Sequence, residues 1–176
     1  MTHRTLIRTA SLLILSLSLA ACVTSAPPVK APVDNTTPAQ RMAAVDAVAA
    51  GSDAKELAVQ PLRDAEIEDL RMNAQAKRQA NDLAGAAEAL NQALLISEGD
   101  PSILQERAEI ALLQGDWTRA ETLARKAVEL GSKTGPLCRR HWATIEQSRL
   151  ARGEKENAVS AHAQLEGCTV PGIKRY

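Results

Sequence analysis

The sequence has very few aromatic residues and no excess of charge of either sign. Among 176 residues there are no phenylalanines, one tyrosine and two tryptophans, while basic and acidic side chains both number 21. Binding of nucleic acid through phosphate contacts needs a dense basic cluster, and no cluster here exceeds a pair such as Arg139-Arg140. We therefore expect no nucleic-acid partner and a core of close helix contacts through small side chains.

Motifs of the common catalytic sites are also missing. The sequence has no glycine-rich phosphate loop, no Gly-x-Ser-x-Gly turn and no His-Glu-x-x-His helix. Neighbouring acids such as Glu66, Glu68 and Asp69 fall on helix faces, where charged side chains are normally solvated. We expect a non-enzymatic protein with no cofactor and no metal.

The first residues combine two basic side chains with a short apolar run. Arg4 and Arg8 precede an apolar run over residues 9–19, which is the order of a secretory signal. The run is shorter than the roughly 20 residues of a transmembrane helix. Residues 19–22 read Leu-Ala-Ala-Cys, which resembles the lipobox of bacterial lipoproteins and implies cleavage after residue 21 and acylation of Cys22 with chains such as palmitate. The alternative is an ordinary signal peptide that contains a cysteine.

The same resemblance implies where the mature protein lies. Cleavage of residues 1–21 leaves 19 basic and 21 acidic side chains. Val23 stands where enterobacterial-type lipoproteins carry the aspartate that retains them at the inner membrane, so we expect a lipid anchor in the outer membrane, facing the periplasm. Residues 22–40 hold four prolines among polar residues and predict a semi-rigid linker behind the lipid.

Behind the linker we expect three regions. Residues 41–66 predict an N-terminal helical segment, with short helices at 41–50 and 53–59. Residues 67–168 form the main folded domain, and residues 169–176 form a C-terminal tail.

The main domain repeats itself with a period of 34 residues. Small and apolar residues recur with this shift: Leu70 with Leu104, Ala74 with Ala108, Ala86 with Ala120, and Ala93 with Ala127. The turn residues Gln114-Gly115-Asp116-Trp117, followed by alanines, resemble the tetratricopeptide repeat family, whose period is the same. A third copy follows with a shift of 38, which places Gly115 on Gly153, and the four extra residues fall in the connector 131–136.

The resemblance implies an all-α, right-handed solenoid of about three helix-turn-helix repeats. Glu146 and Leu165 depart from the family's preference for small residues and leave the packing of the third repeat open. A plain helical bundle whose alanines imitate a period is the alternative. The expected helices are 61–79, 83–96, 101–113, 117–130, 139–151 and 154–165.

The family's mode of binding implies a function. First helices of such repeats line a groove that holds a partner's peptide or helix, so we expect an adaptor or scaffold for an unidentified envelope protein. The alternative is a structural or assembly factor for a secretion, pilus or cell-wall machine. Aligned on the family, the groove residues are Arg71, Gln75, Arg78, Gln105, Glu109, Arg140 and Gln147.

Once Cys22 is acylated, Cys138 and Cys168 are the only cysteines left. They flank the start of the first helix and the end of the second helix of the third repeat, which meet at one end of a hairpin. An even pair in an exported protein is usually bonded, so we expect a disulfide. Two free thiols are one alternative, and a zinc site with His141 and His162 is another, although the spacing is not that of a common finger.

Overall fold

The computed structural model describes residues 34–50 and 62–169. The expected signal peptide, Cys22, most of the linker, the predicted helix 53–59 and most of the tail lie outside these residues. The described ranges contain seven α-helices and no strand. They are α2 (Pro38–Ala50), α3 (Ala65–Gln79), α4 (Leu83–Ile96), α5 (Pro101–Leu113), α6 (Trp117–Leu130), α7 (Gly135–Ala151) and α8 (Lys155–Glu166).

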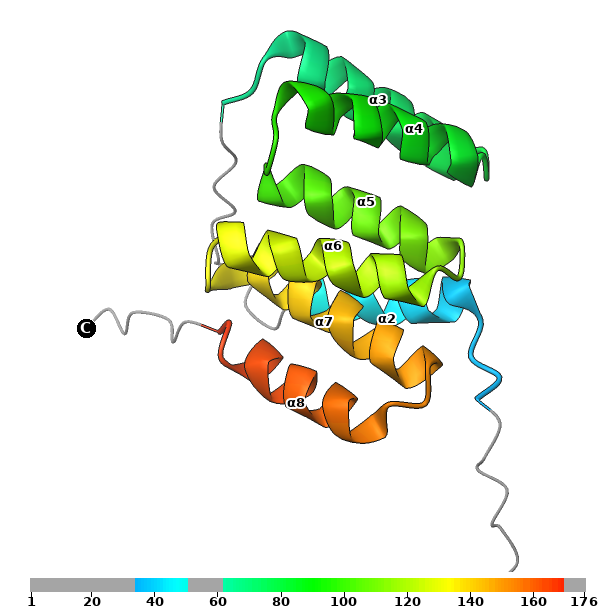
Figure 1. Cartoon of the computed structure of the whole chain (residues 1–176), viewed down its shortest axis with the longest axis vertical. Coiled ribbons are helices and arrows are strands. Elements are labelled where there is room, and N and C mark those ends of the chain that lie inside the picture. Colours follow the sequence, from blue (N-terminus) through cyan, green and yellow to red (C-terminus); the bar gives the residue numbers. More distant parts are fainter. Residues whose placement is uncertain (1–33, 51–61, 170–176) are drawn as a thin grey trace, which may run out of the picture. The chain divides into compact units, whose positions relative to one another are not determined.

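Six of these helices form three stacked hairpins, α3–α4, α5–α6 and α7–α8 (Figure 1). Each hairpin also packs on the next, because α4 contacts α5 and α6 contacts α7. Small side chains let the helices pack closely. Ala86 and Ala120, which are equivalent in the first two repeats, are both fully buried. The expected all-α, tetratricopeptide-like fold is confirmed.

The turn inside each hairpin has the same backbone geometry. Asn81, Gly115 and Gly153 adopt positive φ angles of 60°, 76° and 75°, in the left-handed region that glycine enters freely and asparagine more easily than most residues. Asp82 and Asp116 follow the first two turns, and each carboxylate accepts a hydrogen bond from the backbone N–H three residues on. Successive turns are therefore 34 and 38 residues apart, which are the shifts that align the repeats in the sequence.

Three of the expected repeat helices need corrected bounds. α3 begins at Ala65 rather than residue 61, because Asp64 caps it by accepting a hydrogen bond from the Glu66 N–H. α7 begins at Gly135 rather than residue 139, because Pro136 stands in its first turn, where its missing N–H costs no helical bond. α8 runs over 155–166, one residue later at each end than expected.

The helix expected at 41–50 begins three residues earlier, at Pro38, so the expected linker ends sooner. Thr37 and Gln40 form a capping box across this start. The Gln40 N–H donates to Thr37 Oγ1 at 3.2 Å, and the Thr37 N–H donates to Gln40 Oε1 at 2.8 Å.

The third hairpin accommodates its two unusual residues. Leu165 is buried in a core cluster against which Trp142 packs. Glu146 lies at the side of α7 and contacts His162 of α8, with 3.2 Å between Oε1 and Nδ1. The hairpin therefore remains closed. None of the described helices is long and apolar enough to span a membrane.

The packing of Ala120 yields a prediction. Ala120 lies in a core cluster with Ala111 and Leu112 of α5, so Ala120→Leu would overpack the middle hairpin at a cost of about 1–3 kcal/mol. Chemical denaturation followed by circular dichroism measures the loss. Ala84→Leu, at an exposed alanine of α4, is the control and should change stability little. An unchanged Ala120→Leu variant would contradict the close contact between α5 and α6.

Candidate functional site

The candidate site is the surface formed by the first helices of the three hairpins, α3, α5 and α7, which we name the first-helix face. This face carries the residues that the sequence assigned to a partner groove. The structure places them as follows: Arg71, Gln75 and Arg78 on α3, Gln105 and Glu109 on α5, and Arg140 and Gln147 on α7.

Glu109 lies at the centre of this face and is only 2% exposed. Arg140 of α7 donates to both of its carboxylate oxygens, and the contact to Oε2 is 3.0 Å. Arg78 of α3 donates to Oε2 at 3.2 Å, and Gln105 donates to Oε1 at 3.0 Å. One buried carboxylate therefore joins the first helices of all three hairpins.

The positive charge of Arg140 is stabilised by this arrangement. Burial disfavours the guanidinium cation, but the carboxylates of Glu109 and Asp46 outweigh that effect and raise the pKa of Arg140 above its ordinary value. A buried carboxylate is tolerated only when charge and hydrogen bonds compensate it, and Arg140 supplies both.

The hydrogen-bond network continues from Gln105 into α7. The Gln105 amide donates to Thr144 Oγ1 at 2.8 Å, and its Oε1 lies 2.7 Å from His141 Nδ1. Thr144 in turn donates to the backbone carbonyl of Arg140 at 2.9 Å. Gln105, His141 and Thr144 are each at most 1% exposed, so the network fixes how α5 and α7 pack.

Helix α2 occupies part of the first-helix face. It packs on α7 and, less extensively, on α5, and Figure 1 shows it beside α7. Asp46 of α2 accepts a hydrogen bond from Arg140 at 2.5 Å. Arg41 of α2 donates to the Gln147 side chain and to its backbone carbonyl, both at 3.3 Å.

The face over α3 is arranged differently. Arg71 binds Glu106 of α5 and Glu68 of its own helix, and these contacts raise the pKa of Arg71, with Glu106 contributing most. Gln75 is exposed. Arg78 reaches inward to Glu109, and its side chain remains 33% exposed.

These positions correct the expected groove. Gln105 and Glu109 are buried and cannot line an open surface, because neighbouring helices cover both side chains. Arg140 and Gln147 contact α2. Gln75 is therefore the one exposed residue of the expected groove, and the Arg71, Arg78 and Arg140 side chains are 17%, 33% and 27% exposed.

Neither the helix that covers part of the face nor the buried network beneath it was predicted from the sequence. Thr37-Pro38-Ala39-Gln40 carries the signal of a capping box with proline in the first turn, which could have placed the start of α2. No local signal indicates that α2 docks on α7, since that contact joins residues about a hundred positions apart, such as Arg41 and Gln147.

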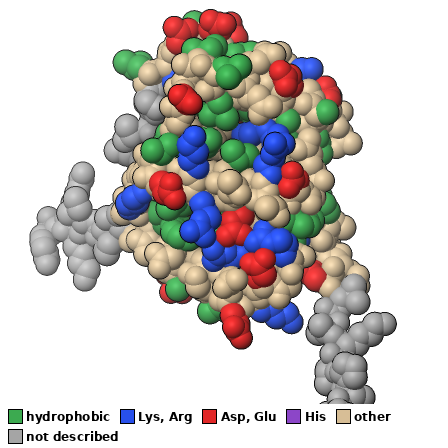
Figure 2. All heavy atoms as spheres, viewed as in Figure 1, with side chains coloured by type: hydrophobic (Ala, Val, Ile, Leu, Met, Phe, Trp, Pro, Cys, Tyr) green, Lys and Arg blue, Asp and Glu red, His purple; other side chains and the backbone are tan. Residues whose placement is uncertain are grey.

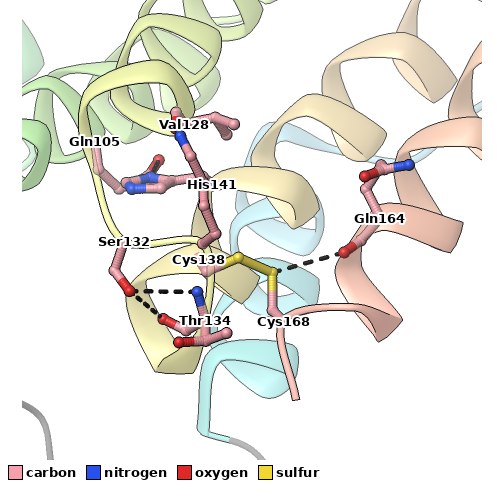
Figure 3. The surroundings of a disulfide bond; sticks show 9 residues. Gln105, Val128, Ser132, Thr134, Cys138, His141, Gln164 and Cys168 are labelled. Atoms are coloured by element: carbon pink, nitrogen blue, oxygen red, sulfur yellow. Dashed lines mark hydrogen bonds between the residues drawn. A yellow bond between two sulfur atoms is a disulfide. The ribbon is translucent and has the colours of Figure 1, made fainter. Parts of the chain in front are cut away.

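The structure contains the expected disulfide between Cys138 and Cys168. The S–S distance is 2.01 Å and the two Cα atoms are 5.7 Å apart, within the usual range for a bridge. The backbone N–H of Gly135 also donates to the carbonyl of Cys168 at 2.8 Å. The disulfide (Figure 3) and this hydrogen bond tie the start of α7 to the end of α8.

The zinc alternative does not fit this geometry. Both thiols are used by the disulfide, and His162 lies exposed on α8 against Glu146. Across residues 34–50 and 62–169, no three His, Cys, Asp or Glu side chains are grouped so that they could hold a metal ion.

His141 lies one turn after Cys138, between the disulfide and Gln105 (Figure 3). Burial, with a smaller effect from the positive charge of Lys133, lowers the pKa of His141 to about 4. The ring is therefore neutral at physiological pH, and its Nδ1–H donates to Gln105. Nε2 is buried and has no hydrogen-bond partner among the described residues.

Basic and acidic side chains lie beside one another on the face shown in Figure 2. Between the second and third hairpins, Glu121 of α6 accepts hydrogen bonds from Arg149 of α7 and from Arg152, directly after α7. Among the neighbouring acids of α3, Glu68 binds Arg63 and Arg71, and Glu66 and Asp69 are exposed. The cluster around Glu121 joins the second and third hairpins.

A scan against protein-family models and a search of curated proteins each found no match. Among solved structures, the chain is similar to the globular C-terminal domain of LpoP from P. aeruginosa. The two share 28% sequence identity with a TM-score of 0.57, and the match covers 60% of this chain and 99% of that domain.

Neutral His141 makes stability depend on pH. An unfolded chain binds a proton at histidine near pH 6.5, whereas folded His141 does so near pH 4. The unfolded state therefore gains protons first, and the free energy of unfolding should fall by about 1.3 kcal/mol between pH 7.5 and 5.5. His141→Gln should weaken this dependence, and His162→Gln should keep it. Equal wild-type stability at both pH values would contradict a buried neutral imidazole.

Proposed function

We propose that this protein is a lipid-anchored adaptor of the bacterial envelope that binds a protein partner through the first-helix face. The observation that carries the proposal is that this face already holds a helix. α2 lies on it through buried apolar side chains and through the Arg140–Asp46 ion pair, which is how a groove recognises a helix of another protein.

The open part of the face offers room for such a partner. Gln75 of α3 is exposed, and the Arg78 side chain is 33% exposed although it also binds Glu109. Gln75 presents an amide, and Met72 on the same helix adds an apolar surface that is 59% exposed. A surface that combines polar and apolar side chains in this way suits a protein segment.

The proposed location rests on the lipobox-like sequence that ends at Cys22. In our proposal acylated Cys22 anchors this chain in the outer membrane, facing the periplasm, and the following residues connect the anchor to the repeats. The repeats themselves are similar to the globular C-terminal domain of LpoP, which the match covers to 99%. The protein acts by binding and carries out no reaction of its own.

Site-specific photocrosslinking in living cells tests the proposal. A photoreactive residue at Gln75, on the open part of the face, should capture one envelope protein. The same residue at Val159, which is 70% exposed on α8, is the control and should not capture it. The crosslink from Gln75 should weaken in a Cys22→Ser variant, because that product loses its anchor.

Two results would count against the adaptor. Identical capture profiles from Gln75 and Val159 would show that the first-helix face has no special role. Sedimentation of the protein with isolated cell wall, with no captured protein from either position, would favour the structural role instead.

A further inference from the structure

Helix α2 lies outside the repeat pattern of the domain. It precedes α3 in the sequence, yet it packs on α7 and α5, which belong to the third and second hairpins. It lies antiparallel to α7, since Arg41 meets Gln147 near one end and Ala49 meets Arg139 near the other. α2 thus occupies the position of a bound peptide helix in a repeat array.

The apolar part of this contact is small. Met42, Val45 and Ala49 form one side of α2 at helical spacing, and they are 3%, 0% and 8% exposed. Val45 and Met42 join a core cluster with Ala111 of α5 and Ala143 of α7. Val48, which is partly buried, packs against the same cluster. Three larger side chains and one alanine therefore provide most of the apolar burial of a helix of 13 residues.

The polar contacts of α2 favour particular residue types at particular positions, and they leave one buried polar atom of α2 without a hydrogen-bond partner among the described residues. Asp46 faces the Arg140 guanidinium that also binds Glu109. The surface of α5 and α7 that α2 covers, which we name the seat, therefore favours an acid at this position. Arg41 is 3% exposed and lies over the Trp117 ring at 5.7 Å. Its Nε is buried without a hydrogen-bond partner in the described part of the chain, which weakens docking.

We infer that α2 is an exchangeable internal ligand, and that the seat it fills on α5 and α7 binds an amphipathic partner helix of the same pattern. The pattern is that of α2, in which an apolar residue, Met42, directly follows Arg41. A second apolar residue, an acid and a small residue follow four, five and eight positions after the arginine, as Val45, Asp46 and Ala49 do. This inference rests on the proposed function and adds the binding site and the chemistry of the partner. While α2 is docked, the seat is closed to other helices.

A labelled synthetic peptide of residues 34–50 tests this inference by fluorescence anisotropy. The receptor is the full mature chain with Cys22→Ser, without or with Val45→Asp, which places a charge in the apolar seat and releases α2. The peptide should bind the Val45→Asp chain at least about tenfold more tightly than the parent, because a filled seat lowers the apparent affinity. Ala47→Asp, on the exposed side of α2, should behave like the parent.

The peptide itself supplies the matched controls. A peptide with Val45→Asp should not bind either chain, and one with Asp46→Lys should bind the released chain at least about tenfold more weakly than the native peptide, since it faces Arg140 with the wrong charge. Equal binding of the native peptide to the parent and Val45→Asp chains would overturn the inference.

A second experiment needs no substitution in the helix. A protease site inserted within residues 51–61 allows the folded chain to be cut between α2 and α3. The cut segment should then exchange with labelled peptide. A segment that stays bound and does not exchange over a day would make α2 a fixed part of the fold. That result would remove this inference and leave the photocrosslinking test of the adaptor unaffected.

Discussion

The packing of the three first helices depends on one buried carboxylate. Glu109 accepts hydrogen bonds from Arg78 of α3, Arg140 of α7 and its helical neighbour Gln105. A charge removed from water in this way is stable only if its partners stay in place. The positions of α3 and α7 relative to α5 are therefore linked through a single side chain.

The same carboxylate connects the repeats to α2. Arg140 is held by Glu109 on one side and presents its guanidinium to Asp46 on the other. Gln105 extends the network to Thr144 and to His141, which lies beside the disulfide. The side chains that contact α2 are thus also held by contacts within the repeats, and a preorganised surface loses less entropy when it binds. The disulfide adds to this rigidity by closing the last hairpin.

The sequence predicted the parts of the fold that local signals determine. Alanine spacing, the turn residues Asn81, Gly115 and Gly153, and the aspartate caps are read within a few residues, and they placed three helices, 83–96, 101–113 and 117–130, at their observed bounds. The start of α7 was misplaced because Gly135 and Pro136 were assigned to a connector. Proline suits a first helical turn as well as a loop.

The candidate site was harder to predict. Alignment on a repeat family identifies which residues belong to first helices, but it cannot show whether another helix covers them. Glu109 and Gln105 are polar, and polar residues on a helix are usually exposed. Their burial results from contacts with α3 and α7, more than 25 residues away in either direction. The docking of α2 is likewise a tertiary contact without a periodic signal.

The free energy of unfolding of a Glu109→Gln variant tests the central claim most directly. Glutamine keeps the shape but leaves Arg78 and Arg140 without their buried counter-charge, so the account predicts a loss of about 3–5 kcal/mol. Native-state hydrogen exchange should show protection falling together in α3, α5 and α7. Glu106→Gln, at a more exposed acid one turn away, should cost less than about 1 kcal/mol. A similar small cost for both variants, with changes confined to α5, would contradict the account.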